Sequence, residues 1–145
     1  MIHGIELTDL SMVAGESGAV HHFMRASDPL FVGFGEVYFS TIDREAIRAW
    51  KMHRRMTLNL VVPIGRVLFN FLDLREDSPS CGESSTFVLA RLPWQRLTVS
   101  PGIWFGFKGL DHGTNLICNQ ADLVHDPYEV MRKPLNAIEA DWSSK

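Results

Sequence analysis

The chain has 145 residues, of which 46% are hydrophobic and 21% are charged, an ordinary composition for one folded domain. Its net charge of −3 provides no basic surface to attract nucleic acid, and no apolar run approaches the ~20 residues that a membrane-spanning helix needs. The chain begins without a basic or apolar leader, and Cys81 and Cys118 are too far apart to form a paired metal motif. We therefore expect a single cytoplasmic domain over residues 1–145 that binds neither nucleic acid nor a membrane.

Strand signals dominate the chain, beginning with a stretch rich in β-branched and aromatic residues. We predict strands over Glu36–Ile42, Ile47–His53, Thr57–Val62, Arg66–Arg75, Thr86–Leu92, Arg96–Val99, Ile103–Leu110 and Thr114–Asn119. Turn residues separate several of them, at Pro63–Gly65, Asp77–Gly82, Pro101–Gly102 and Asp111–Gly113. Near the C-terminus, Pro127 and Pro134 exclude one long helix and leave at most a short helical turn near Tyr128–Arg132. Seven or eight short strands predict an all-β sandwich or barrel.

Several short motifs follow one another in the order seen in a known family. They are Gly15–Gly18, Gly65–Val67, Leu72–Arg75, Ser78–Gly82, Leu97–Phe107 and Ala140–Trp142. This series resembles the dTDP-4-dehydrorhamnose 3,5-epimerases, and Trp50–Arg55 is also similar to a segment of the sugar 3,4-ketoisomerases. The resemblance implies a cupin-type β-barrel (a jelly roll), a homodimer, and no metal or organic cofactor. It also implies a reaction in which a proton leaves the carbon beside a C4 ketone and returns to the other face.

The sequence departs from the epimerases at the positions of their catalytic residues. Lys51 stands where the family has a histidine base, and Leu58 stands where it has a lysine. No tyrosine lies near Asp122–Leu123, where the family has its tyrosine acid, and Phe105 replaces another histidine. These departures favour epimerisation at one carbon, or a ketoisomerisation, over the double epimerisation.

Lys51 and His53 are the candidate catalytic residues because residues two apart on a strand share a face. An imidazole exchanges protons near neutral pH, so His53 is our preferred base. A protonated Lys51 would polarise the ketone, although a buried lysine can itself act as a base, and the reverse assignment stays open. The alternative is that both lie on a solvated strand face without chemistry.

Five further residues are candidates for binding a dTDP-, GDP- or CDP-linked sugar. Arg48 matches the family arginine that helps to hold the nucleotide phosphates, or it forms a surface ion pair. Trp104 could stack on a base or sugar, or pack in the core. The polar residues Asn59, Asn115 and Asn119 lie on predicted strands and could bind sugar hydroxyls.

A metal site is not expected, because Lys51-Met52-His53 supplies one imidazole where metal-binding cupins have two. The leading hypothesis is a cofactor-independent epimerase or isomerase of 4-keto-6-deoxy nucleotide sugars in polysaccharide precursor synthesis. The alternatives are a non-catalytic cupin that binds a nucleotide sugar or another sugar, and a metal-dependent cupin enzyme.

Overall fold

The structure is a computed structural model and describes residues 1–143. Over this range the chain forms twelve strands and one 3₁₀ turn. The strands are β1 (Ile5–Asp9), β2 (Met12–Gly15), β3 (Gly18–His21), β4 (Glu36–Ile42), β5 (Ile47–His53), β6 (Leu58–Ile64), β7 (Arg66–Asp73), β8 (Ser84–Ala90), β9 (Gln95–Val99), β10 (Ile103–Gly109), β11 (Asn115–Ala121) and β12 (Val130–Arg132), and the 3₁₀ turn η1 is Leu135–Ala137.

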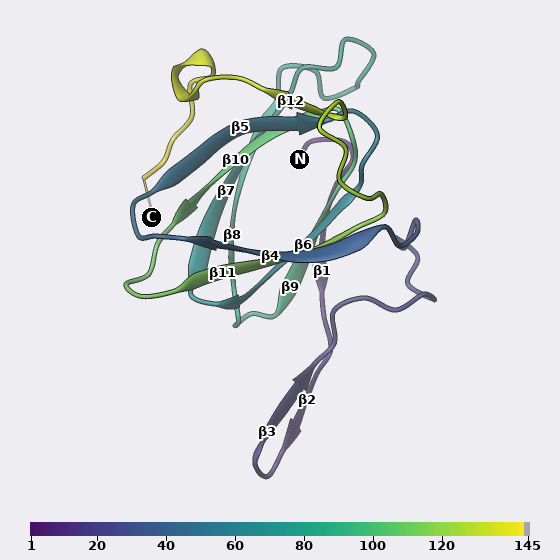
Figure 1. The fold of residues 1–145 in the computed structure, drawn as a ribbon, viewed down its shortest axis with the longest axis vertical. Helices are drawn as coiled ribbons and strands as arrows, with labels where there is room; N and C mark the ends of the chain where they lie inside the picture. Colours follow the sequence, from purple (N-terminus) through teal and green to yellow (C-terminus); the bar gives the residue numbers. More distant parts are fainter. Residues whose placement is uncertain (144–145) are drawn as a thin grey trace.

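Two five-stranded antiparallel sheets face each other as the walls of a barrel (Figure 1). One sheet has the strand order β1-β9-β6-β11-β4, and the other has the order β12-β5-β10-β7-β8. From β4 onward, successive strands mostly alternate between the two sheets, which is the arrangement of a jelly roll. The predicted all-β, cupin-type barrel is therefore confirmed.

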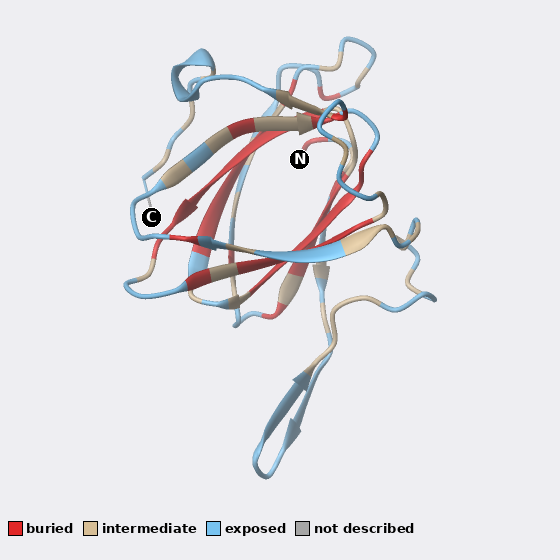
Figure 2. Cartoon of the chain, viewed as in Figure 1, coloured by how far each residue is buried: buried red, intermediate tan, exposed pale blue. Residues whose placement is uncertain are grey.

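The hydrophobic core fills the space between the two sheets. On β6 the alternating residues Leu58, Leu60 and Val62 face this interior, whereas Val61 packs in a separate apolar cluster with Trp94 outside the barrel. Figure 2 shows the buried residues concentrated along the strands of both walls. Each fully buried aliphatic or phenylalanine side chain contributes about 1.5–3 kcal/mol, so this interior supplies most of the stability of the barrel.

The N-terminal region contains strands that the sequence did not predict. β1 joins the first sheet beside β9, and β2 and β3 form a hairpin that stands away from the barrel (Figure 1). Small residues and glycines dominate the hairpin, so its strand propensity is low. No helix within residues 1–143 is long and apolar enough to cross a membrane.

Two local predictions were wrong. Where a helical turn was expected near Tyr128–Arg132, Tyr128 and Glu129 end a tight turn and Val130–Arg132 are extended, because β12 pairs with β5 as an edge strand; the 3₁₀ turn begins only at Leu135. The expected turn at Pro63–Gly65 is narrower, because β6 continues through Ile64 and only Gly65, with a positive φ of 77°, turns the chain.

The motif that ends β7 anchors the following loop through one buried carboxylate. Asp73 is 0% exposed and accepts hydrogen bonds from the Arg75 side chain at 2.7 and 2.8 Å. It also accepts hydrogen bonds from the hydroxyls of Ser78 (2.5 Å) and Ser80 (2.7 Å). The hydrogen bonds from Arg75 lower the pKa of Asp73 most strongly. Burial raises this pKa, and the hydrogen bonds from the two serines lower it further. These residues, which carry much of the family resemblance, therefore hold a loop in place.

We predict that Asp73→Asn lowers the free energy of unfolding by about 2–4 kcal/mol at pH 7, because Arg75 loses its charged partner. A carboxyl whose pKa is depressed by folding stabilises the protein above its unfolded pKa, so the difference from wild type should shrink as the pH falls below about 4. Urea denaturation at several pH values measures both effects. The exposed neighbour Asp77→Asn is the matched control, and an equal loss in both variants would contradict the prediction.

Candidate active site

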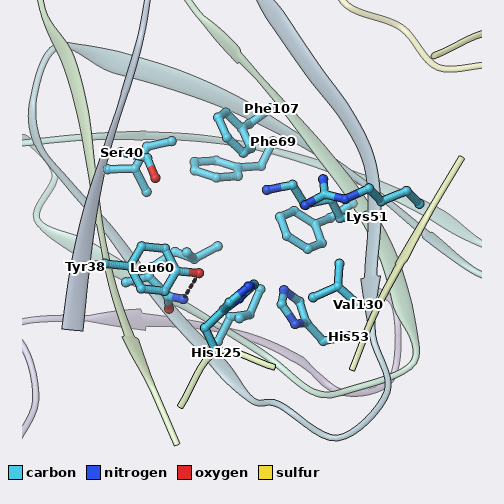
Figure 3. Close-up of a pocket in the computed structure, with 14 residues that line it drawn as sticks. Tyr38, Ser40, Lys51, His53, Leu60, Phe69, Phe107, His125 and Val130 are labelled. Carbon is cyan, nitrogen blue, oxygen red and sulfur yellow. Dashed lines mark hydrogen bonds between the residues drawn. The ribbon is translucent and has the colours of Figure 1, made fainter. Parts of the chain in front are cut away.

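A cavity, open in part to solvent, lies between the two walls of the barrel (Figure 3). Both sheets and one loop contribute to its lining: Tyr38 and Ser40 from β4, Lys51 and His53 from β5, Leu58 and Leu60 from β6, Phe69 from β7, Phe105 and Phe107 from β10, Ile117 and Asn119 from β11, Val130 and Arg132 from β12, and His125 from the loop after β11. Ionisable groups thus meet beside aromatic and aliphatic side chains.

Strand β5 directs Lys51 and His53 into this cavity, as the alternation of side chains predicts. Trp50, which precedes Lys51 on the strand, faces the other way. Its indole N–H donates to the carbonyl of Leu135 at 3.2 Å, and its ring packs against Trp142 with centroids 5.5 Å apart. Lys51 and His53 therefore line the cavity, and the alternative of a solvated strand face does not describe their position.

His53 forms a buried pair with a carboxylate that the sequence did not single out. Its Nδ1 lies 2.7 Å from Oε2 of Glu129, and the two side chains are 8% and 1% exposed. The other oxygen of Glu129 accepts hydrogen bonds from the backbone N–H groups of Arg55 and Met56, both at 2.8 Å. An ionised carboxylate can only accept, so Nδ1 of His53 is the donor and Nε2 is left to accept a proton.

The surroundings of Glu129 keep it ionised. Burial alone would raise its pKa, but hydrogen bonds from the Arg55 amide, the His53 ring and the Met56 amide together lower it. The carboxylate therefore remains an acceptor for the Nδ1–H of His53. His53 is therefore held in an orientation that leaves Nε2 free to accept a proton.

A tyrosine lies on the wall opposite His53. The hydroxyl of Tyr38 accepts a hydrogen bond from Nδ2 of Asn119 at 2.9 Å, the dashed line in Figure 3, and so keeps its own proton available to a ligand. Asn119 is held in turn by the backbone N–H of Asn59, which donates to its Oδ1 at 3.0 Å. Burial raises the pKa of Tyr38, Asn119 opposes this, and Glu36 and Glu129 raise the pKa further. Tyr38 is thus a neutral proton donor near pH 7.

Positive charge collects beside Lys51. Arg132 on β12 pairs with Lys51 in the strand register, and the guanidinium of Arg48 lies 6.0 Å from the centroid of the Phe107 ring. Burial lowers the pKa of Lys51, and the charges of Arg132 and Arg48 lower it further. Arg48 borders the cavity without being among its lining residues, and it joins Lys51 and Arg132 around a neighbouring surface hollow.

Three other residues predicted to bind substrate lie outside the cavity. The Asn59 side chain donates to the carbonyl and side-chain oxygens of Gln120 at 3.2 and 3.1 Å and accepts from the Thr98 hydroxyl at 2.8 Å. Trp104 is buried away from the lining and lies under the ammonium of Lys133, 5.0 Å from its ring centroid.

Asn115, the third of these residues, fixes two turns at one end of the barrel. Its Oδ1 accepts from the backbone N–H groups of Arg66 and Asp111, both at 3.1 Å, and its Nδ2 donates to the carbonyls of Ile42 and Asp111 at 3.1 and 3.0 Å. A Cβ on Gly65 would lie 2.6 Å from the same Oδ1, so this close approach needs glycine.

Sequence reasoning missed three lining residues with chemistry, Tyr38, His125 and Arg132, and it also missed Glu129, which contacts His53 from outside the lining. Tyr38 had a signal, because it alternates correctly on the predicted strand Glu36–Ile42. The others lie on the loop after β11, for which no strand alternation was available, and on or just before the edge strand β12, which was not predicted. Within residues 1–143, no cluster of three or more histidine, cysteine, aspartate or glutamate side chains could hold a metal ion.

Comparison with known proteins found similar sugar-modifying enzymes, although no model of a protein family matches the chain. The chain is 30% identical over 127 residues to a probable low-salt glycan biosynthesis epimerase, Agl13, of Haloferax volcanii, covering 86% of this chain and 81% of that protein. The crystal structure of a dTDP sugar isomerase from Desulfovibrio desulfuricans has a TM-score of 0.90 and 34% identity, covering 94% of this chain and 87% of that one. A dTDP-4-dehydrorhamnose 3,5-epimerase from Elizabethkingia anophelis shares the fold, with a TM-score of 0.85 and 17% identity over 99% and 84% of the two chains.

The contact between His53 and Glu129 predicts that the neutral imidazole carries its proton on Nδ1. In Glu129→Gln, the amide oxygen should keep the two backbone N–H groups, and the NH₂ group would then face Nδ1 and force the proton onto Nε2. Long-range ¹H–¹⁵N spectra of histidine-labelled protein distinguish the two tautomers, with His53→Gln used to assign the signal. A wild-type Nε2–H tautomer would contradict this geometry.

Proposed function

The chain belongs to the dTDP-4-dehydrorhamnose 3,5-epimerase-like family of sugar epimerases and isomerases, and on that basis we propose that it inverts one carbon beside the ketone of a nucleotide-linked 4-keto-6-deoxy sugar. One observation carries this proposal: two proton-transfer groups, His53 with Glu129 and Tyr38, stand on facing walls of a single cavity. Similarity to a glycan biosynthesis epimerase supports a product that serves as a glycan or polysaccharide precursor.

Inversion needs a base on one face of the sugar and an acid on the other. In the proposed reaction Nε2 of His53 takes the proton from the carbon beside the ketone, and the electron pair moves to the ketone oxygen to form an enolate. Tyr38 then donates its proton to the same carbon from the opposite face, and the ketone is restored. His53 returns its proton to solvent, and Tyr38 regains one before the next turnover.

Lys51 is the group that we assign to the ketone oxygen. It lies two residues from His53 on the same strand, so a sugar held against the base has its carbonyl within reach of the ammonium group. A cation there stabilises the charge that develops on the enolate oxygen. This assignment gives Lys51 the role that the family lysine fills from the position of Leu58.

The arginines beside the cavity suit the diphosphate that links sugar to nucleoside. Arg48 and Arg132 flank Lys51, and planar guanidinium groups bind phosphate oxygens with two parallel hydrogen bonds. The nucleotide of the substrate could be dTDP, GDP or CDP, and the similarity to a dTDP sugar isomerase favours dTDP. No cofactor has a part in this reaction scheme.

A second reaction, ketoisomerisation, stays a candidate because that similar enzyme is a sugar isomerase. There His53 would return the proton to the neighbouring carbon on the same face, and Tyr38 would move a proton between the two oxygens. The purely sugar-binding alternative gains no support, because a binding protein has no need of the buried His53–Glu129 pair.

A homodimer is the expected assembly, since the family resemblance implies pairing through N-terminal strands. The protruding β2–β3 hairpin fits that role, and its Val13 and Val20 are 56% and 59% exposed. The cytoplasmic location and the single domain over residues 1–145 remain predictions of the sequence.

We expect Tyr38→Phe to separate proton removal from inversion. In deuterated water, NMR of a panel of dTDP-, GDP- and CDP-linked 4-keto-6-deoxy sugars should show exchange at one carbon with the wild type, together with the inverted product. Tyr38→Phe should keep the exchange and lose at least about 100-fold of the inversion, whereas His53→Gln should lose both.

Tyr128→Phe is the matched control, because Tyr128 is 89% exposed and lies outside the cavity lining. Unchanged inversion in Tyr38→Phe would contradict the assigned acid. A product with the ketone moved to the next carbon would establish ketoisomerisation instead.

A further inference from the structure

Four cations gather around one end of the cavity without a carboxylate partner. They are Arg48, Lys51, Arg132 and Lys133, which together line a hollow on the surface of β5 and β12. Among residues 1–143, none of the four forms an ion pair with an acidic side chain. Such a cluster repels itself, and the repulsion is relieved by an anionic ligand.

Lys51 is the member of this cluster whose charge can change. The two arginines stay protonated at every accessible pH, whereas a lysine amine can release its proton when it is buried. Lys51 lines the cavity beside Phe105 and Phe107 and faces Arg132 across the strand register. Burial and the two arginine charges all lower its pKa in the unliganded protein.

We infer that Lys51 takes up a proton when the diphosphate of the substrate binds between Arg48 and Arg132, so that its amine becomes fully charged only in the complex. The inference rests on the proposed function, because it takes the anion to be part of a nucleotide sugar. Two negative charges placed beside the arginines offset their effect on the amine. The ketone oxygen of the substrate then accepts a hydrogen bond from an ammonium group, which became charged because the substrate bound.

This coupling has a defined direction with pH. Where the free amine is partly neutral, binding must draw a proton from solvent, so affinity falls as the pH rises. One linked proton allows a fall of up to about tenfold per pH unit. Below that range Lys51 is charged in both states, and binding no longer depends on its protonation.

Other ionisable groups face the same space, so the proton must be assigned by substitution. Tyr38 lies on β4, His125 lies on the loop after β11, and His53 lies further along β5, in contact with Glu129 from the segment before β12. Glu129 is already held by three hydrogen bonds, and Tyr38 is already protonated. The two imidazoles are therefore the rival acceptors.

The test is isothermal titration calorimetry of the full chain with dTDP-glucose, CDP-glucose and GDP-mannose. These ligands lack the ketone, so no turnover occurs, and both phosphates are diesters with fixed charge. Repeating each titration in buffers of different ionisation enthalpy, between about pH 7 and pH 10, counts the protons taken up. The variants are Lys51→Met, His53→Gln, His125→Gln and Lys133→Met, the last being a matched lysine that contacts Trp104 outside the cavity lining.

The expected result is an uptake that rises above zero within this range, survives in the Lys133, His53 and His125 variants, and vanishes in Lys51→Met. Binding without uptake, or uptake that persists in Lys51→Met, overturns the inference but leaves the proposed function intact. Failure of every nucleotide sugar to bind overturns both.

A second readout covers the case in which Lys51→Met does not fold. In wild-type protein labelled with ¹³C-lysine, the titration midpoint of one buried lysine Cε resonance should rise by about one pH unit or more on adding the ligand. A midpoint that stays in place overturns the inference.

Discussion

The candidate active site depends on the hydrogen bonds that the buried carboxylate of Glu129 accepts from His53 and from two backbone N–H groups. This carboxylate ties the segment before β12 to the end of β5 through two backbone N–H groups, and it holds the His53 ring by Nδ1. One residue thus closes the barrel edge and selects the tautomer that leaves Nε2 facing the cavity. Without it, the imidazole would lose both its orientation and the hydrogen bond that selects its tautomer.

The jelly-roll arrangement determines which groups can face the proposed base, His53, across the cavity. Because β4 and β5 belong to different sheets, a ligand between the walls meets His53 on one side and Tyr38 on the other. The interior aromatic rings give this space apolar walls, and a less polar surrounding would strengthen electrostatic contacts such as the proposed one between Lys51 and a ketone oxygen. The positive cluster at β5 and β12 lies next to this chemistry, so binding of the charged part of a substrate and activation of its sugar can be linked.

The sequence predicted the fold better than the site, for a physical reason. The residue pattern predicted both ends of β4 and of β5 correctly, and alternation placed Lys51 and His53 on one face of β5. Glu129 could not be found in this way, because its partner lies 76 residues earlier and only the closed barrel brings them together. Asn59 and Asn115 were polar residues on predicted strands, but their amides satisfy backbone and side-chain groups that the alternation pattern does not reveal. No tyrosine lies near Asp122–Leu123, where the family has its tyrosine acid, but Tyr38 lies on β4, which pairs with β11 immediately before that position.

A crystal structure with a bound nucleotide sugar, such as dTDP-glucose, is the most direct measurement of the central claim. The account predicts a sugar ring inside the barrel with Nε2 of His53 and the hydroxyl of Tyr38 on opposite faces of it, and with the diphosphate between Arg48 and Arg132. A sugar outside the cavity, or one with both groups on the same face, would contradict it.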